Sequence, residues 1–187
     1  MLYRRGLALT DKGEDAKAIE DFTAALVLRP RDLSTLSARA NAYGRLGKTD
    51  AALADLGAAI DADRKAALPL INRGFALVDL NRNEEAKKDF DAAIKLDSRQ
   101  AEAFKGRGDA SRGLGDLIAA LEDYAAAIRL DKTYRNAFYG RARAFIDMRD
   151  YQRAFSEADQ AVELDQSFDA GYFSRAYACG SLDPWIR

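Results

Sequence analysis

The chain has 187 residues, of which 48% are hydrophobic and 32% charged, a balance typical of a folded globular protein and not of a disordered one. Lysine and arginine together number 29 and aspartate and glutamate 30, so the weak net charge gives no electrostatic reason to expect a nucleic acid or an anionic membrane as partner. The chain contains no histidine, which removes the usual general base and the commonest metal ligand, so we expect neither a metal site nor a cofactor.

The sequence carries no sign of targeting to a membrane or of secretion. No apolar run approaches the roughly 20 residues that a membrane helix needs, and residues 1–13 lack the apolar stretch and cleavage site of a secretory signal. Cys179 is the single cysteine, so an intramolecular disulfide is impossible, which suits a reducing compartment. These features predict a cytoplasmic protein.

One interval organises the chain from end to end. An arginine recurs every 34 residues and is followed each time by Gly or Ala; the six are Arg5, Arg39, Arg73, Arg107, Arg141 and Arg175. Two alanine columns keep the same interval, at Ala18, Ala52, Ala86, Ala120 and Ala154 and at Ala25, Ala59, Ala93, Ala127 and Ala161. A large apolar column stands between them at Phe22, Leu56, Phe90 and Tyr124, interrupted at Ala158. Unrelated columns that share one period indicate tandem repeats.

Two helices are expected in each repeat, because the apolar residues within it follow helical spacing. In chain order, the predicted helices lie near 2–12, 15–28, 33–46, 49–62, 67–80, 83–96, 101–114, 117–130, 135–148, 151–164 and 169–181. The turn inside each repeat is expected at Gly13, Gly47, Asn81, Gly115 and Arg149. Short polar connections join the repeats, so neighbouring helices must pack antiparallel.

This pattern resembles the tetratricopeptide repeat family. The best copy is Leu70-x2-Arg73-Gly74-x2-Leu77 followed by Ala86-x3-Phe90, and similar copies run through nearly the whole chain. The resemblance implies an all-α, right-handed superhelical solenoid of antiparallel helix pairs. We expect a single domain of about five and a half repeats, at 1–32, 33–66, 67–100, 101–134, 135–168 and, in part, 169–187.

The resemblance also implies a function, that of a scaffold that binds a peptide or helix of a partner protein in its concave groove. Projecting the family's inner face onto the first helices gives the candidate binding residues Asn41, Leu68, Ile71, Asn72, Phe75, Lys105, Asp109, Arg112, Tyr139 and Arg143. For Ile71 and Phe75 the alternative is that both side chains turn inward and complete the core. Asn41 and Asn72 could hold a peptide backbone through their amides, or could be idle surface residues.

Catalysis is not expected, because nothing pairs Cys179, a serine or a carboxylate with a base. Helical repeats that read RNA are usually more basic than this chain. Two further alternatives stay open, a non-catalytic arm of a larger enzyme or assembly, and a self-associating structural module.

An acidic column accompanies the arginine column and offers it partners. Each acid stands 18 residues before the next arginine, as in Asp21 and Arg39 or Asp89 and Arg107. An anion-binding row of arginines would be an alternative, but unpaired charges on a packing face are costly. The spacing therefore favours ion pairs that bridge successive repeats and fix their stacking.

The last predicted helix has no partner helix, because Pro184 stops any helix soon after it. This helix carries Tyr172, Phe173 and Tyr177, and Trp185 and Ile186 follow it. Repeat arrays normally end on a polar face. The tail could fold back as a cap, the chain could be part of a longer array, or the end could pair with a second copy; we favour the last two, which leaves a homodimer possible.

Overall fold

The chain is all-helical over the residues that the structure describes. The computed structural model describes residues 1–182, which form eleven helices and no strand. The helices are α1 (Leu2–Asp11), α2 (Asp15–Leu28), α3 (Leu33–Arg45), α4 (Thr49–Ala62), α5 (Ala67–Asp79), α6 (Asn83–Leu96), α7 (Ala101–Gly113), α8 (Leu117–Leu130), α9 (Arg135–Asp147), α10 (Tyr151–Leu164) and α11 (Asp169–Leu182). Every predicted helix is confirmed. Within the described range, no helix is both long enough and apolar enough to cross a membrane.

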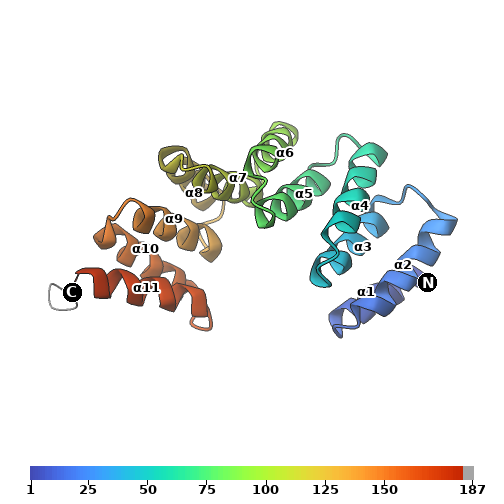
Figure 1. The fold of residues 1–187 in the computed structure, drawn as a ribbon, viewed down its shortest axis with the longest axis horizontal. Helices are drawn as coiled ribbons and strands as arrows, with labels where there is room; N and C mark the ends of the chain where they lie inside the picture. The colour runs from blue at the N-terminus through green and yellow to red at the C-terminus, as the bar shows by residue number, and fades with distance from the viewer. Residues whose placement is uncertain (183–187) are drawn as a thin grey trace.

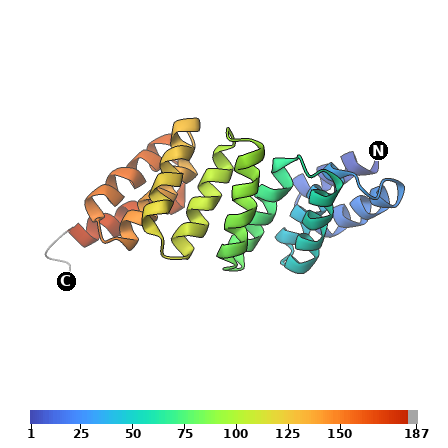
Figure 2. The ribbon, with the colours of Figure 1, turned by 90° about the horizontal axis from the view of Figure 1, so that it is seen from above.

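The helices stack as a curved solenoid, which Figure 1 shows as an arch with the two chain ends in opposite arms. Figure 2 shows the same helices from above as a row of successive pairs. Consecutive first helices (α1, α3, α5, α7, α9 and α11) contact one another, whereas no two second helices (α2, α4, α6, α8 and α10) are in contact. Elements on the inside of a curve lie closer together than those on the outside. The first helices therefore form the inner wall of the arch.

The turn inside each repeat needs one residue in the left-handed backbone region. The five predicted turn residues are the ones with positive φ, namely Gly13, Gly47, Asn81, Gly115 and Arg149. Glycine adopts this region without a steric penalty and asparagine tolerates it, whereas arginine is strained there. The turn prediction is confirmed, and the fifth repeat makes the turn with an unfavourable residue.

Large side chains of the second helices fill the core by entering notches in the first helices. Phe90 of α6 is fully buried between Gly74 of α5 and Gly106 of α7, and a Cβ built on either glycine would lie less than 3 Å from its ring. Tyr124 is held in the same way by Gly108 and Gly140. One aromatic ring thus packs against its own repeat and the next, which ties consecutive repeats together.

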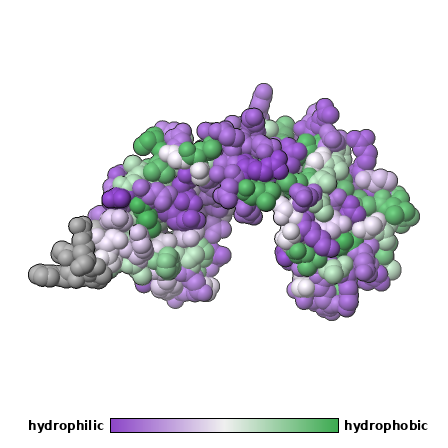
Figure 3. Space-filling model, viewed as in Figure 1, coloured by the Kyte–Doolittle hydropathy of each residue, from purple (hydrophilic) through white to green (hydrophobic). Residues whose placement is uncertain are grey.

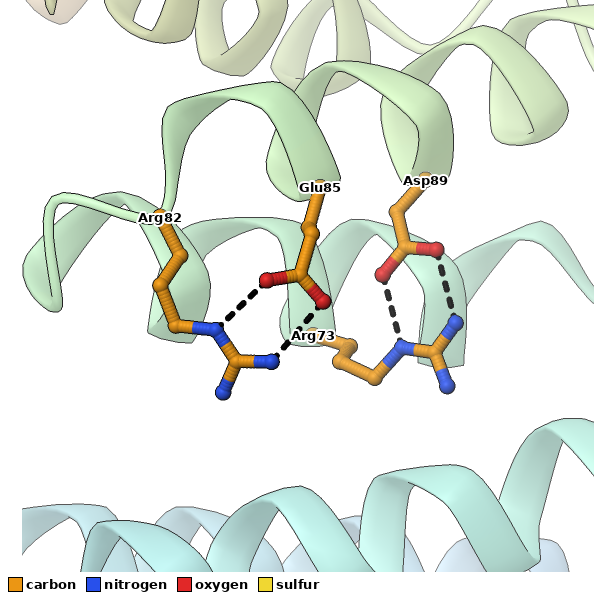
Figure 4. A network of polar contacts seen from close by, with 4 residues as sticks. All are labelled: Arg73, Arg82, Glu85 and Asp89. Carbon is orange, nitrogen blue, oxygen red and sulfur yellow. Dashed lines mark hydrogen bonds and ion pairs between the residues drawn. The ribbon is translucent and has the colours of Figure 1, made fainter.

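The regular spacing of arginine and acid produces ion pairs, but not the predicted ones. Each acid pairs with the arginine 16 residues before it, in the first helix of its own repeat, so the expected 18-residue pairing across repeats is wrong. The pairs are Arg5 with Asp21 at 2.5 Å, Arg39 with Asp55 at 2.7 Å, Arg73 with Asp89 at 2.7 Å, Arg107 with Asp123 at 2.6 Å and Arg141 with Glu157 at 2.7 Å. Figure 4 shows the pair of the third repeat, in which Arg73 donates two hydrogen bonds to the Asp89 carboxylate.

The pairing has a geometric cause. Antiparallel helices of one repeat face each other directly, so an arginine of the first helix reaches the acid opposite it in the second. The hydrogen bond from Arg5 lowers the pKa of Asp21, and that to Asp123 raises the pKa of Arg107. Ion pairs of this column between repeats form only where a further acid is available, as between Arg107 and Asp91 at 2.6 Å. The arginine column mainly joins the two helices of one repeat.

The last helix, α11, leaves aromatic side chains in solvent. The exposed fraction is 38% for Tyr172, 74% for Phe173 and 49% for Tyr177. On its inner side, Ala178 packs with Phe145 and Ala154, so the helix is docked on the fifth repeat. Pro184, Trp185 and Ile186, which follow this helix in the sequence, lie outside the described residues.

Candidate protein-binding groove

The inner wall of the arch is hollow between its two arms, as the space-filling view shows (Figure 3). A cavity of about 290 Å³ lies among α1, α3 and α5, and we call it the N-terminal cavity. Its lining residues are Tyr3, Leu7, Thr10, Leu33, Ser34, Ser37, Ala38, Asn41, Arg45, Leu68 and Asn72. A second cavity of about 510 Å³ shares Asn41, Arg45 and Asn72 with it, so the hollow continues along α3 and α5.

Three predicted binding residues meet in the N-terminal cavity. Asn41 is exposed, Asn72 is half-buried and the Leu68 side chain is 57% exposed. Ser37 joins them, although its sequence position gave no reason to rank it above other small polar residues. It is only 8% exposed, and its Oγ has no hydrogen-bond partner among the residues described. The cavity therefore combines free polar groups with an exposed leucine.

Local sequence explains why α3 presents these side chains. Asp32 caps the helix by accepting hydrogen bonds from the Thr35 backbone nitrogen at 2.9 Å and from its hydroxyl, and these bonds lower the pKa of Asp32. From that start, residues 34, 37, 38, 41 and 45 follow helical spacing, so they share one face of α3. The alanines that face α4 and the core occupy other positions, which leaves the small polar side chains on the inner wall.

The middle of the wall is charged, but its charges are already paired. In α7, Lys105 lies 2.6 Å from Asp109, and both side chains are largely buried. Asp109 also accepts a hydrogen bond of 2.8 Å from the hydroxyl of buried Tyr124, whose pKa is raised, first by burial and then by that carboxylate. Arg112 reaches Asp147 of α9 at 2.8 Å. These three predicted binding residues thus already have partners within the protein.

Ile71 and Phe75, two of the three apolar candidates of α5, differ in burial. Ile71 is 3% exposed and belongs to the hydrophobic core around Phe90, so its prediction as a binding residue is wrong, and the alternative of a core side chain holds. Because its helix is apolar on several sides, the sequence pattern did not show that this side chain points into the core. Phe75 is half-buried, with its ring 5.2 Å from Phe90 and 5.3 Å below the ammonium of Lys105. Phe75 therefore supports the core and reaches the wall as well.

A further cavity, of about 350 Å³, lies between α9 and α11, and we call it the C-terminal cavity. It is lined by Tyr139, Arg143, Ile146, Asp147, Phe173, Ser174 and Tyr177. The Arg143 guanidinium lies 5.6 Å from the Tyr139 ring centre and is exposed, and no ion pair of Arg143 is found within residues 1–182. Phe173 and Tyr177, which the sequence marked as parts of an uncovered end, thus also line a cavity.

No group of three or more His, Cys, Asp or Glu side chains within the described part of the chain is arranged to hold a metal ion. Cys179 is exposed on α11. The inner wall offers hydrogen-bonding groups, apolar patches and the exposed cation of Arg143, all of which are groups that can bind a ligand.

Comparisons with known proteins agree with this architecture. A thermophilic tetratricopeptide repeat protein of Thermus thermophilus superposes with a TM-score of 0.82 at 21% identity, over 95% of this chain and 97% of that one. A chain of the APC/C hetero-tetramer Cut9-Hcn1 has a TM-score of 0.85 at 15% identity, over 95% of this chain and 35% of that one. YrrB, described as a protein with an unusual peptide-binding site, has a TM-score of 0.68 at 19% identity, over 94% of this chain and 90% of that one.

At these identities the structural likeness shows the fold alone. No curated protein matches the sequence. Models of the tetratricopeptide repeat match residues 1–32, 33–65 and 71–137, which together make up more than half of the chain. The chain therefore belongs to the tetratricopeptide repeat family.

Proposed function

We propose that this protein is an interaction module whose inner wall binds a peptide or a helix of a partner protein. The N-terminal cavity carries the proposal, because the side chains of Ser37, Asn41 and Asn72 have no hydrogen-bond partner among the described residues and stand beside the exposed Leu68. Such a combination of apolar surface and free hydrogen-bonding groups is usual in protein-binding sites. The near-neutral chain favours a protein over a nucleic acid as partner.

The binding residues in this proposal are Asn41, Leu68 and Asn72 at one end of the wall and Tyr139 and Arg143 at the other. Phe75 stands between them, and the paired residues Lys105, Asp109 and Arg112 shape the wall more than they contact a guest. The module acts by binding and not by catalysis, which is also how a non-catalytic arm of a larger assembly would act. We place it in the cytoplasm on the basis of its single cysteine.

A peptide selection tests the proposal. A display library of random twelve-residue peptides is selected on the wild type, and the enriched peptides are measured against Asn41→Ala/Asn72→Ala, against Tyr139→Ala/Arg143→Ala, and against the control Gln152→Ala, an exposed position of the second helix α10. At least one groove variant should weaken binding tenfold or more, and the control less than twofold. A selection without any enriched peptide, or peptides that bind all the variants as tightly as wild type, would contradict it.

Self-association is a second candidate function, favoured by the exposed aromatic rings of α11. Uncovered apolar patches on an end helix are common places for a second copy to dock. Light scattering of the wild type and of Phe173→Ser/Tyr177→Ser should show a concentration-dependent dimer that the double variant loses. A wild type that stays monomeric at millimolar concentration would rule this candidate out.

A further inference from the structure

We infer that the N-terminal cavity binds an uncharged segment of its partner, with one aliphatic side chain against the leucines and the neighbouring peptide groups on Ser37, Asn41 and Asn72. The inference rests on the proposed function and goes further, because it names the chemistry of the guest. It comes from four features of the cavity: its charge, its buried hydroxyl, its amides and its size.

The cavity offers a ligand no charge that is not already paired. Tyr3 and Arg45 are its only ionisable lining residues, and Arg45 lies 3.0 Å from Asp15 of α2. A basic side chain that entered the cavity would lose water without gaining an opposite charge, and an acidic one would have to compete with Asp15 for the guanidinium of Arg45. The lining therefore selects against charged guests.

The buried hydroxyl of Ser37 indicates that the floor of the cavity is built for a polar contact. Buried polar groups nearly always have hydrogen-bond partners, because a buried group without one is destabilising. Thr10 on the neighbouring helix follows this rule, since its hydroxyl donates to the Leu7 carbonyl at 2.7 Å. Ser37 does not follow it, although it is more than nine-tenths buried and lines the cavity. A change to another staggered rotamer about its Cα–Cβ bond would turn the hydroxyl toward the cavity that the residue lines.

The two amides complete the match to a peptide. Asn41 and Asn72 stand on neighbouring first helices, and each side chain offers a donor pair and an acceptor. A peptide group also carries one donor and one acceptor, and in an extended chain these alternate along the backbone. The amides and Ser37 can therefore bond to neutral peptide groups without any charged partner.

The size of the cavity and its apolar walls determine which side chain of the guest fits. The cavity has a volume of about 290 Å³, at the lower limit for small-molecule pockets, which is enough for one side chain and the peptide groups beside it. Leu7, Leu33 and Leu68 supply apolar surface, of which Leu7 and Leu68 are 36% and 57% exposed. A leucine-sized side chain would cover this surface.

Nuclear magnetic resonance with blocked tripeptides tests the inference. The probes are acetyl-Ala-Leu-Ala-amide and its counterparts with Glu or Lys in place of Leu, titrated into the isotope-labelled protein. The leucine peptide should shift the side-chain amide signals of Asn41 and Asn72 and bind at least fivefold more tightly than either charged peptide. Raising the salt concentration tenfold should change its affinity less than twofold, because no ion pair is involved.

Substitutions identify the groups that bind. Ser37→Ala and, separately, Asn72→Ala should each weaken binding of the leucine peptide about fivefold. Ser156→Ala, which changes an exposed serine of α10, should leave this affinity unchanged. Alanine is the best helix former, and each spectrum reports whether the variant is folded. Equal binding of a charged peptide, shifts confined to α9 and α11, or full affinity in both variants would overturn the inference. None of these results would contradict the wider proposal, which the peptide selection tests by itself.

Discussion

Repeats two and four hold different chemistry at equivalent positions of the inner wall. Ser37 and Asn41 of α3 correspond to Lys105 and Asp109 of α7, two repeats later in the sequence. In α7 the two side chains pair with each other at 2.6 Å, whereas in α3 neither has a hydrogen-bond partner among the residues described. The same scaffold position is thus closed to a guest where its polar group is satisfied internally, and open where it is not.

The packing of the two regions differs in a matching way. Gly106 of α7 corresponds to Asn72 of α5, and the second-helix side chains that they face are Phe90 and Leu56. The buried rings of Phe90 and Tyr124 each lie against a glycine at this position, whereas the smaller Leu56 leaves room for a larger side chain on the wall. The size of this core residue therefore affects which side chain the wall can carry at this position.

The largest effect is expected from Gly106→Ala, which tests this packing argument. A Cβ at this position would overlap the fully buried ring of Phe90, so we expect a loss of about 3 kcal/mol in the free energy of unfolding, at the upper end for an overpacked core. Urea denaturation followed by circular dichroism measures it. Adding Phe90→Leu, which puts the smaller leucine of repeat two opposite position 106, should restore at least half of the loss.

The equivalent change in repeat two serves as the control. Asn72→Ala should alter the free energy of unfolding by less than about 0.5 kcal/mol, because Asn72 is half-buried and fills no notch. The comparison between the repeats fails if both variants lose the same stability, or if the Phe90→Leu change brings no recovery.

Asp109→Ala should have the next largest effect. Its removal leaves the buried hydroxyl of Tyr124 without an acceptor and Lys105 without its ion pair, so we expect a loss of about 2 kcal/mol in the free energy of unfolding. Asn41→Ala, at the equivalent position of repeat two, should cost under about 0.5 kcal/mol. Thermal unfolding of the two variants measures both losses. A loss for Asn41→Ala as large as that for Asp109→Ala would mean that the polar groups of repeat two are also satisfied within the protein.

The start of the helix distinguishes the two repeats as well, with a smaller effect that depends on pH. Asp32 caps α3 through its side chain, whereas Gln100 at the start of α7 makes no such bond. Because the hydrogen bonds from Thr35 lower the pKa of Asp32, the cap stabilises the fold above the ordinary pKa near 4 and is lost as the pH falls through the lowered value.

Substitutions at Asp32 isolate that effect from the other carboxylates. Asp32→Ala should cost about 1 kcal/mol at pH 7, whereas Asp32→Asn, which can still cap, should cost little. Between pH 7 and pH 3 the wild type should lose more stability than Asp32→Asn, as urea denaturation at both values will show. Equal losses in the two proteins would mean that Asp32 contributes nothing specific.

The sequence predicts the fold because every helix and turn follows from a repeated column. A single period constrains eleven helices at once, so an ambiguous residue in one repeat is resolved by its equivalents in the others. Turn residues are equally clear, because the left-handed backbone selects Gly or Asn, and the column identifies Arg149 where composition alone would not.

The details of the wall were harder to predict, for two physical reasons. An acid such as Asp89 has one arginine 16 residues before it and another 18 residues after it, and only the facing of the helices decides that Arg73 and not Arg107 is its partner. Ile71 and Phe75 lie one turn apart on an apolar helix, and a small rotation about the helix axis buries the first and half-exposes the second. Periodicity fixes which residues are equivalent, but not the rotation of each helix.

The smallest expected effect concerns the turn of the fifth repeat. Arg149 has a φ of 61°, in a position that repeats two and four fill with Gly47 and Gly115. The side chain is exposed, so its replacement by glycine removes strain at the cost of some freedom gained by the unfolded chain. We expect Arg149→Gly to raise the free energy of unfolding by about 0.5 to 1 kcal/mol. Arg149→Ala, which removes the same side chain but keeps the strained Cβ, should bring no gain; if it stabilises the protein as much as glycine does, the backbone strain is not the cause.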